Sequence, residues 1–202
     1  MEQSHRPMPK GLRISSWIIA IATIVACYVP LLFLGAGGSA EAASVDSFNE
    51  SDSVLDTATM ISLTIVPLLQ ITNLILGIVV AVRKDSDALS VTRAIMLTYK
   101  LGLIPLFILG GMIEALCIIG GFHPILVGFM WVVGFVLGVA GWFAVMSGSI
   151  WTIATAVKAK RFALISSGEC ALYIVLSIFF VADVVGSIIL FVRSKRPKTS
   201  AL

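Results

Sequence analysis

The chain has 202 residues, of which 58% are hydrophobic and only 12% are charged, and its net charge is +3. A soluble domain typically carries about 25% charged residues, so this composition excludes a soluble domain and predicts an integral membrane protein whose solvent is lipid. The mean hydropathy of +1.05 indicates the same class, and the length fits one helical bundle rather than several domains.

Five apolar stretches are long enough to cross a bilayer, because a crossing needs roughly 20 apolar residues for a hydrocarbon core of about 30 Å. They run from 14 to 37, from 57 to 82, from 101 to 120, from 124 to 157 and from 162 to 192. The sequence therefore predicts an all-α, polytopic bundle of about five transmembrane helices that forms a single domain over 1–202. The last two stretches exceed one crossing, so each is expected to tilt, to kink or to extend into the interface.

The first stretch has a second interpretation. It follows "HRPMPKGLR" and precedes "GGSAEAAS", which is also the layout of a secretory signal peptide with a small-residue cleavage site. The apolar run is long for that part of a signal peptide. The prediction is therefore a retained first span.

The charged residues predict which side of the membrane each loop faces. The basic residues form four clusters beside the apolar stretches: Arg6, Lys10 and Arg13; Arg83, Lys84, Arg93 and Lys100; Lys158, Lys160 and Arg161; Arg193, Lys195, Arg196 and Lys198. The segment 38–56 contains five acids: Glu41, Asp46, Glu50, Asp52 and Asp56. Because basic loops favour the cytoplasm, we expect a cytoplasmic N-terminus and an acidic outer loop over 38–56. Five spans would leave the tail outside, against its basic charge; the alternative is that part of 162–192 lies in the interface or re-enters.

Three of the stretches place polar or small residues on one face when 100° is assigned to each residue. These are Thr59, Ser62, Gln70, Asn73 and Gly77 in the second; Gly134, Gly138, Gly141, Gly148, Thr152 and Thr155 in the fourth; and Glu169, Tyr173, Ser177, Asp183 and Ser187 in the fifth. Small residues let helix backbones approach, and Asn or Gln can bond across helices. The glycines of the fourth stretch are therefore assigned to helix packing: Gly134, Gly138, Gly141 and Gly148. Gln70 and Asn73 are expected to form structural hydrogen bonds between helices. The alternative is that they line a ligand site or contact a partner subunit.

Two carboxylates interrupt apolar stretches: Asp183 in "FFVADVVGSIILFVR" and Glu114 in "GGMIEALC". A charge at mid-span costs about 2.5 to 3.5 kcal/mol on insertion scales, so both are candidates for contact with a substrate, an ion or a partner helix. Gln70, Asn73 and Tyr173 are further candidates for this contact. For Asp183 the alternative is a structural hydrogen bond, for example to Asn73 or Gln70. Glu169 is expected at the cytoplasmic interface, where "KAKR" can pair with it.

No pattern in the sequence indicates a reaction. The two histidines, His5 and His123, lie at the edges of apolar stretches, and there is no H-E-x-x-H, G-x-S-x-G or P-loop pattern. Cys27, Cys117 and Cys170 are far apart and do not have metal-ligand spacing. We therefore expect no enzymatic activity, no catalytic residue, no metal site and no cofactor.

Four phrases carry a resemblance to known proteins: "YKLGLIPLFILG" (99–110), "GFHPILVGF" (121–129), "MSGSIWTIATAVKAKR" (146–161) and "FFVADVVGSIILFVRSKR" (179–196). They are similar to phrases in an uncharacterised family of small, multi-span bacterial membrane proteins, and the similarity begins at about residue 99. The resemblance implies a helical membrane fold and a bacterial origin. It supplies no catalytic residues.

These observations predict a non-enzymatic accessory subunit of a larger assembly in a bacterial plasma membrane, with a transporter such as an ABC exporter as the expected assembly. The chain has faces suited to helix contacts but no energy-converting domain. One alternative is a small stand-alone transporter or channel that uses Asp183 and Glu114 as proton or cation sites. Another is a membrane immunity or sensor protein whose acidic loop binds a cationic peptide. The expected partners are the lipid bilayer and other membrane subunits or further copies of the chain, and no nucleic acid is expected.

Overall fold

The computed structural model describes residues 7–40, 48–85 and 87–195, and within these residues it contains six helices and no strand. The helices are α1 (Lys10–Ala40), α2 (Phe48–Val82), α3 (Ala88–Gly120), α4 (Val127–Arg161), α5 (Ser167–Leu176) and α6 (Phe180–Lys195). The all-α class predicted from the sequence is confirmed for this part of the chain.

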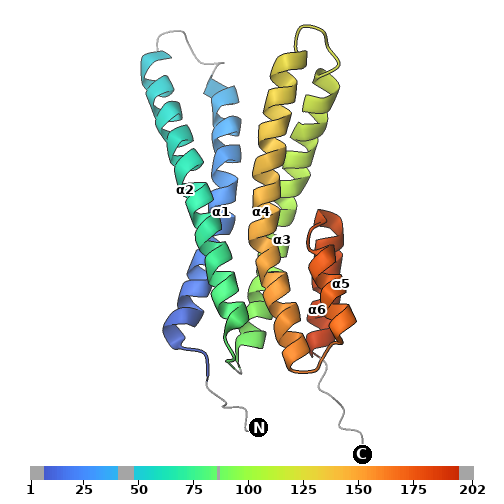
Figure 1. Cartoon of the computed structure of the whole chain (residues 1–202). Helices are drawn as coiled ribbons and strands as arrows, with labels where there is room; N and C mark the ends of the chain where they lie inside the picture. The colour runs from blue at the N-terminus through green and yellow to red at the C-terminus, as the bar shows by residue number, and fades with distance from the viewer. Residues whose placement is uncertain (1–6, 41–47, 86, 196–202) are drawn as a thin grey trace, which may run out of the picture.

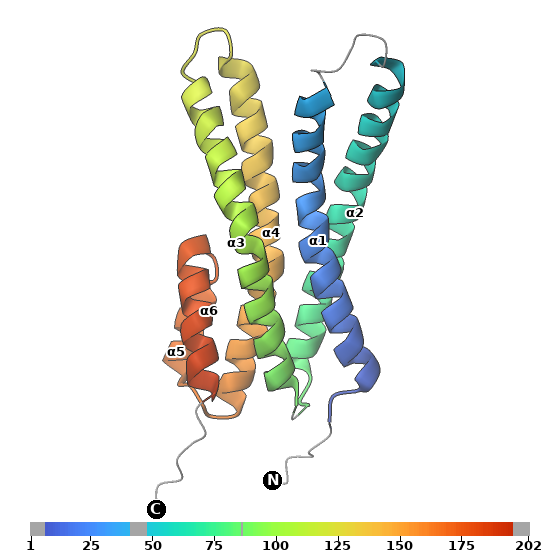
Figure 2. The same ribbon diagram turned by 180° about the vertical axis from the view of Figure 1, so that it is seen from behind.

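Four helices, α1 to α4, are long and apolar enough to cross a membrane. With 33 and 35 residues, α3 and α4 are each about 50 Å long at 1.5 Å per residue. The four helices run side by side as two pairs, α1 with α2 and α3 with α4 (Figures 1 and 2). Further contacts join α2 to α4 and α1 to α3, so the two pairs form one bundle.

The stretch 162–192, predicted as a fifth crossing, does not form one continuous helix. The chain instead forms α5, with ten residues, and α6, with 16, which are too short to cross a core of about 30 Å. In the turn between them, Ser177 N donates to Tyr173 O at 3.0 Å and Phe179 N donates to Leu176 O at 3.1 Å. Because these bonds satisfy the backbone of the turn, an uninterrupted apolar run can reverse direction without a glycine or proline. We call α5 and α6 together the hairpin.

The hairpin packs against α3 and α4 along one half of their length, and α6 ends at the end of the bundle where α1 begins (Figure 1). The stretch 162–192 therefore folds back on itself as two short helices. The tail after residue 195 lies outside the described residues.

The acidic segment 38–56 is less of a loop than predicted, because α1 continues to Ala40 and α2 begins at Phe48. Residues 41–47 and the side chains of 48–59, which together include all five acids of this segment, lie outside the described residues, as does the side chain of Ser62.

Close packing of α3 on α4 requires glycine at position 148. A Cβ at Gly148 would lie 2.6 Å from Cδ1 of Tyr99, a fully buried residue of α3. Gly134 also faces α3, because its Cβ would lie 3.3 Å from Cβ of Cys117. Gly141 differs, since no atom lies within 4 Å of the place where its Cβ would be.

Basic residues at the end of α4 cap the neighbouring helix α2. Lys158 Nζ donates to Arg83 O at 2.9 Å, and Arg161 Nη1 donates to Ala81 O and Val82 O at 3.1 Å each. The last carbonyls of a helix have no partner within the helix, and cations there also complement the helix dipole. Two residues of the "KAKR" cluster therefore fix the end of α2.

Candidate functional site

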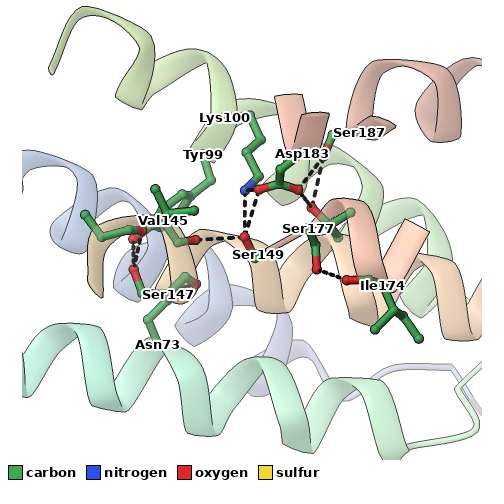
Figure 3. A network of polar contacts seen from close by, with 12 residues as sticks. Asn73, Tyr99, Lys100, Val145, Ser147, Ser149, Ile174, Ser177, Asp183 and Ser187 are labelled. Atoms are coloured by element: carbon green, nitrogen blue, oxygen red, sulfur yellow. Dashed lines mark hydrogen bonds and ion pairs between the residues drawn. The ribbon is translucent and has the colours of Figure 1, made fainter. Parts of the chain in front are cut away.

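Asp183 lies in the first turn of α6, at the tip of the hairpin, and it is 1% exposed. Its Oδ2 atom forms an ion pair with Nζ of Lys100 on α3, which is also buried (Figure 3). The nearest basic residue in the sequence on the same helix is Arg193, but the partner of Asp183 comes from a helix far away along the chain. The hairpin is thus joined to the bundle by a buried ion pair.

Hydroxyl groups of α4 and α6 surround both oxygens of this carboxylate. Ser149 Oγ lies 2.8 Å from Oδ2, and Thr152 Oγ1 and Ser187 Oγ lie 3.2 and 3.4 Å from Oδ1. Lys100 Nζ also donates to Ser149 Oγ at 3.2 Å. Ser149 has one proton, which it donates either to Asp183 or to Val145 O at 2.9 Å. Together with the positive end of the α6 dipole, these groups satisfy the charge of Asp183 inside the chain.

A neighbouring polar network joins α2, α3 and α4. Asn73 Nδ2 donates to Ser147 O at 2.7 Å, and Tyr99 OH and Ser147 Oγ lie 2.6 Å apart (Figure 3). Asn73 Oδ1 also accepts from Trp151 Nε1 at 3.1 Å. Gln70 donates to Cys27 Sγ at 3.7 Å. The proposed bonds from Asp183 to Asn73 or Gln70 are therefore wrong, because each amide bonds to a different helix.

Glu169 and Tyr173 hold the two helices of the hairpin together. Glu169 Oε2 accepts from Ser166 N at 2.8 Å in a capping box, and its Oε1 pairs with Arg193 of α6 rather than with "KAKR" as predicted. The Ser166 backbone amide and the Arg193 guanidinium lower the pKa of Glu169, and Glu169 in turn raises the pKa of Arg193. Tyr173 is buried, and its Cδ1 atom would lie 3.7 Å from a Cβ at Gly186 of α6.

Glu114 lies in a different setting, an open groove between α3 and α4 with a volume of about 420 Å³. The groove is mainly apolar, and its lining includes Cys117, Met130, Trp131, Phe135 and Trp142. Glu114 is the charged residue of this lining, and its Oε1 atom would lie 3.1 Å from a Cβ at Gly138. Among the described residues, no hydrogen-bond or ion-pair partner contacts the Glu114 carboxylate. In a bilayer this carboxylate would therefore face lipid without compensation.

The groove continues the face on which the hairpin packs. Glu114 follows Lys100 by fourteen residues, which places it about 21 Å further along α3 and only about 40° around it. Gly138 precedes Ser149 by eleven residues, so it lies about 20° from Ser149 around α4. Figures 1 and 2 show that α5 and α6 reach only part of the way along α3 and α4. The groove is therefore on the same face, beyond the tip of the hairpin.

A family model covers residues 16–196, and its description is a family of unknown function (DUF6652). The chain belongs to this family. The matched range includes Lys100, Glu114 and Asp183, the charged residues of the α3–α4 face and the hairpin. It also begins nearer the N-terminus than the phrases that carry the sequence resemblance. No protein of curated function and no solved structure matches the chain.

Lys100, Ser149 and Thr152 were not predicted as contacts of Asp183. Lys100 was assigned to a basic cluster at the membrane surface. However, it is twelve residues inside α3, about 18 Å from the start of the helix. Apolar residues flank it on both sides in "TYKLGL", and this isolation within an apolar run is the signal that indicates a buried cation.

Proposed function

We propose that the chain is a non-enzymatic integral membrane subunit that acts as an accessory component of a larger membrane assembly, with a transporter such as an ABC exporter as the expected assembly. The observation that carries this proposal is the ion pair of Lys100 with Asp183. Both charges are buried and satisfied within the chain, so the pair serves to hold the hairpin in place rather than to bind a substrate.

The placement in the membrane is supported by length, composition and charge. Four helices can cross a bilayer, and their outward side chains are largely apolar, as with Leu116, which is 66% exposed, and Phe135, which is 73% exposed. The re-entrant hairpin brings Arg193 to the end of the bundle where the basic residues of α1 and α4 lie. Apart from Lys100, the described residues of the basic clusters then share one side. By the positive-inside rule this is the cytoplasmic side of a bacterial plasma membrane.

A stand-alone transporter or channel is the second candidate, and the open carboxylate of Glu114 favours it. A proton or cation site needs a group that ligands can reach, and Glu114 lies in an open groove. Asp183 is a poorer candidate because a transported ion would have to displace Lys100. The immunity or sensor alternative depends on the acidic segment, much of which lies outside the described residues.

Two measurements on the full chain distinguish the candidates. The tagged chain is purified from its own cells in a gentle detergent, and its complex is sized and identified by mass spectrometry. We expect a membrane subunit at a fixed stoichiometry. If the chain is recovered alone and carries a proton or cation flux after reconstitution into vesicles, the accessory-subunit proposal is wrong and the second candidate holds.

A further inference from the structure

The hairpin and the groove divide one face of the α3–α4 pair between them. Where the hairpin packs, α6 supplies Asp183 to Lys100 of α3. Beyond the hairpin tip the same face carries Glu114, for which the described part of the chain supplies no cation. The groove is thus the part of an established packing face that has no helix on it.

The dimensions of the groove fit a helix. Its lining on α4 extends from Met130 to Trp142, a distance of about 18 Å along the axis. Gly134 and Gly138 belong to this lining, and small residues allow a neighbouring helix to approach closely. Glu114 lies beside Gly138, so an approaching helix would meet the carboxylate at the point of closest contact.

A second copy of this chain does not complement the groove. Apart from Lys100, which is already paired, the described Lys and Arg residues lie at or near the end of the bundle where α1 begins. Glu114 is only six residues from the end of α3 at the opposite end. A copy in the same orientation therefore has no cation at the depth of Glu114, and a lipid chain has no donor at all.

We infer that the groove receives a transmembrane helix of a different membrane subunit, which places a Lys or Arg side chain opposite Glu114. This inference rests on the proposed function and names the surface and the partner chemistry. The proposed contact reverses the charges of the Lys100–Asp183 pair. In the groove α3 supplies the anion, whereas at the hairpin α3 supplies the cation. Pairing removes the cost of an isolated carboxylate in the bilayer.

A photocrosslinking side chain at position 135 tests the surface, with position 136 as the matched control. Phe135 lines the groove, whereas Val136 is exposed, does not line it and lies about 160° from Gly138 around α4. In native membranes, the probe at 135 is expected to label a transmembrane segment of another protein that has a Lys or Arg within one helical turn of the labelled residue. The probe at 136 is expected to give no such product. Equal labelling from both positions, labelling of a second copy or labelling of a segment without a basic residue overturns the inference.

Charge exchange then tests the partner chemistry. Glu114→Lys is expected to reduce recovery of the labelled subunit by about tenfold or more, as for removal of one member of a buried charge pair. Changing the partner's basic residue to Glu is expected to restore it. Glu114→Gln, which keeps the shape, serves as the variant for which misfolding is least expected, and the melting temperature of each isolated variant is the folding control.

The outcomes separate the inference from the proposed function. If a subunit co-purifies equally with the wild type, Glu114→Lys and Glu114→Gln, the groove is not the contact surface although the accessory role stands. If no other membrane subunit co-purifies with the wild type, both the inference and the proposed accessory role are wrong. If a lipophilic cation protects position 135 from labelling and no protein is labelled there, the groove is a small-molecule site and the inference is wrong.

Discussion

In the half of the α3–α4 face that the hairpin covers, a cation on α3 meets an anion on α6, and hydroxyl groups occupy the remaining positions around the carboxylate. In the half beyond the hairpin tip, an anion on α3 meets Gly138 and no cation in the described chain. Both halves use a glycine of α4 opposite a large side chain of α3: Gly148 against Tyr99 and Gly138 against Glu114.

This difference separates two uses of a charge inside an apolar bundle. A buried pair is a weak source of net stability, but removal of one partner leaves the other charge uncompensated. Lys100 and Asp183 therefore specify where the hairpin attaches. Glu114 has no such internal role, so changing it should alter what the chain binds more than how it folds.

The largest effect is expected from breaking the buried pair on one side. Lys100→Met leaves Asp183 unpaired, and Asp183→Leu leaves Lys100 unpaired, and each should destabilise the protein by about 3 to 5 kcal/mol. The double variant should recover most of this loss because neither charge remains. Unfolding free energies in detergent measure this cycle. Additive losses in the double variant would show that the two residues are not coupled.

A smaller loss of stability is expected from substituting glycines of α4. It compares a glycine that contacts α3 with one that faces open space. Gly148→Ala places a Cβ against the Tyr99 ring, and overpacking of this kind costs about 1 to 3 kcal/mol. Gly141→Ala, with nothing within 4 Å, should change stability by less than about 0.5 kcal/mol. Thermal unfolding of the two variants checks the prediction, and equal shifts would argue against the packing of α4 on α3 described above.

The smallest effect is expected at the second ion pair of the hairpin, between Glu169 and Arg193. Because the pKa of Glu169 is lowered in the folded protein, its contribution to stability is fully present above the ordinary pKa of a glutamate and is lost as the pH falls through the lowered value. Glu169→Gln should therefore flatten the pH dependence of stability on the acidic side. Asp183→Leu serves as the comparison, since the loss of stability that it causes should persist at neutral pH. A wild type and Glu169→Gln with identical acid profiles would contradict this assignment.

Four of the five apolar stretches could be predicted from the sequence because length and hydrophobicity determine whether a helix can cross a bilayer. The fifth could not, because the turn after Leu176 contains neither glycine nor proline and is closed by backbone bonds and by Ser177, whose Oγ donates to Ile174 O at 2.6 Å. Hydropathy measures the length of an apolar run and does not detect a reversal within it.

The site was predictable only in part, for a related reason. Helical periodicity placed Asp183 and Ser187 on one inward face, and both contact the same network. The cation that compensates Asp183 is 83 positions away in the sequence, and only the tertiary fold brings it close. The groove at Glu114 also depends on how α3 and α4 pack against each other, which the sequence pattern does not specify.

The most direct measurement compares Asp183→Asn with Glu114→Gln, since each replaces one carboxylate with an amide of the same shape. For each full-length variant, the unfolding free energy of the isolated protein and the recovery of its membrane subunit are measured together. We expect Asp183→Asn to lower stability by roughly 3 kcal/mol or more, because Lys100 loses its counter-charge. We expect Glu114→Gln to keep the stability of the wild type and to lose the subunit. If both variants lose stability equally, or if Asp183→Asn is stable while Glu114→Gln unfolds, the distinction between a structural carboxylate and a partner-binding carboxylate is contradicted.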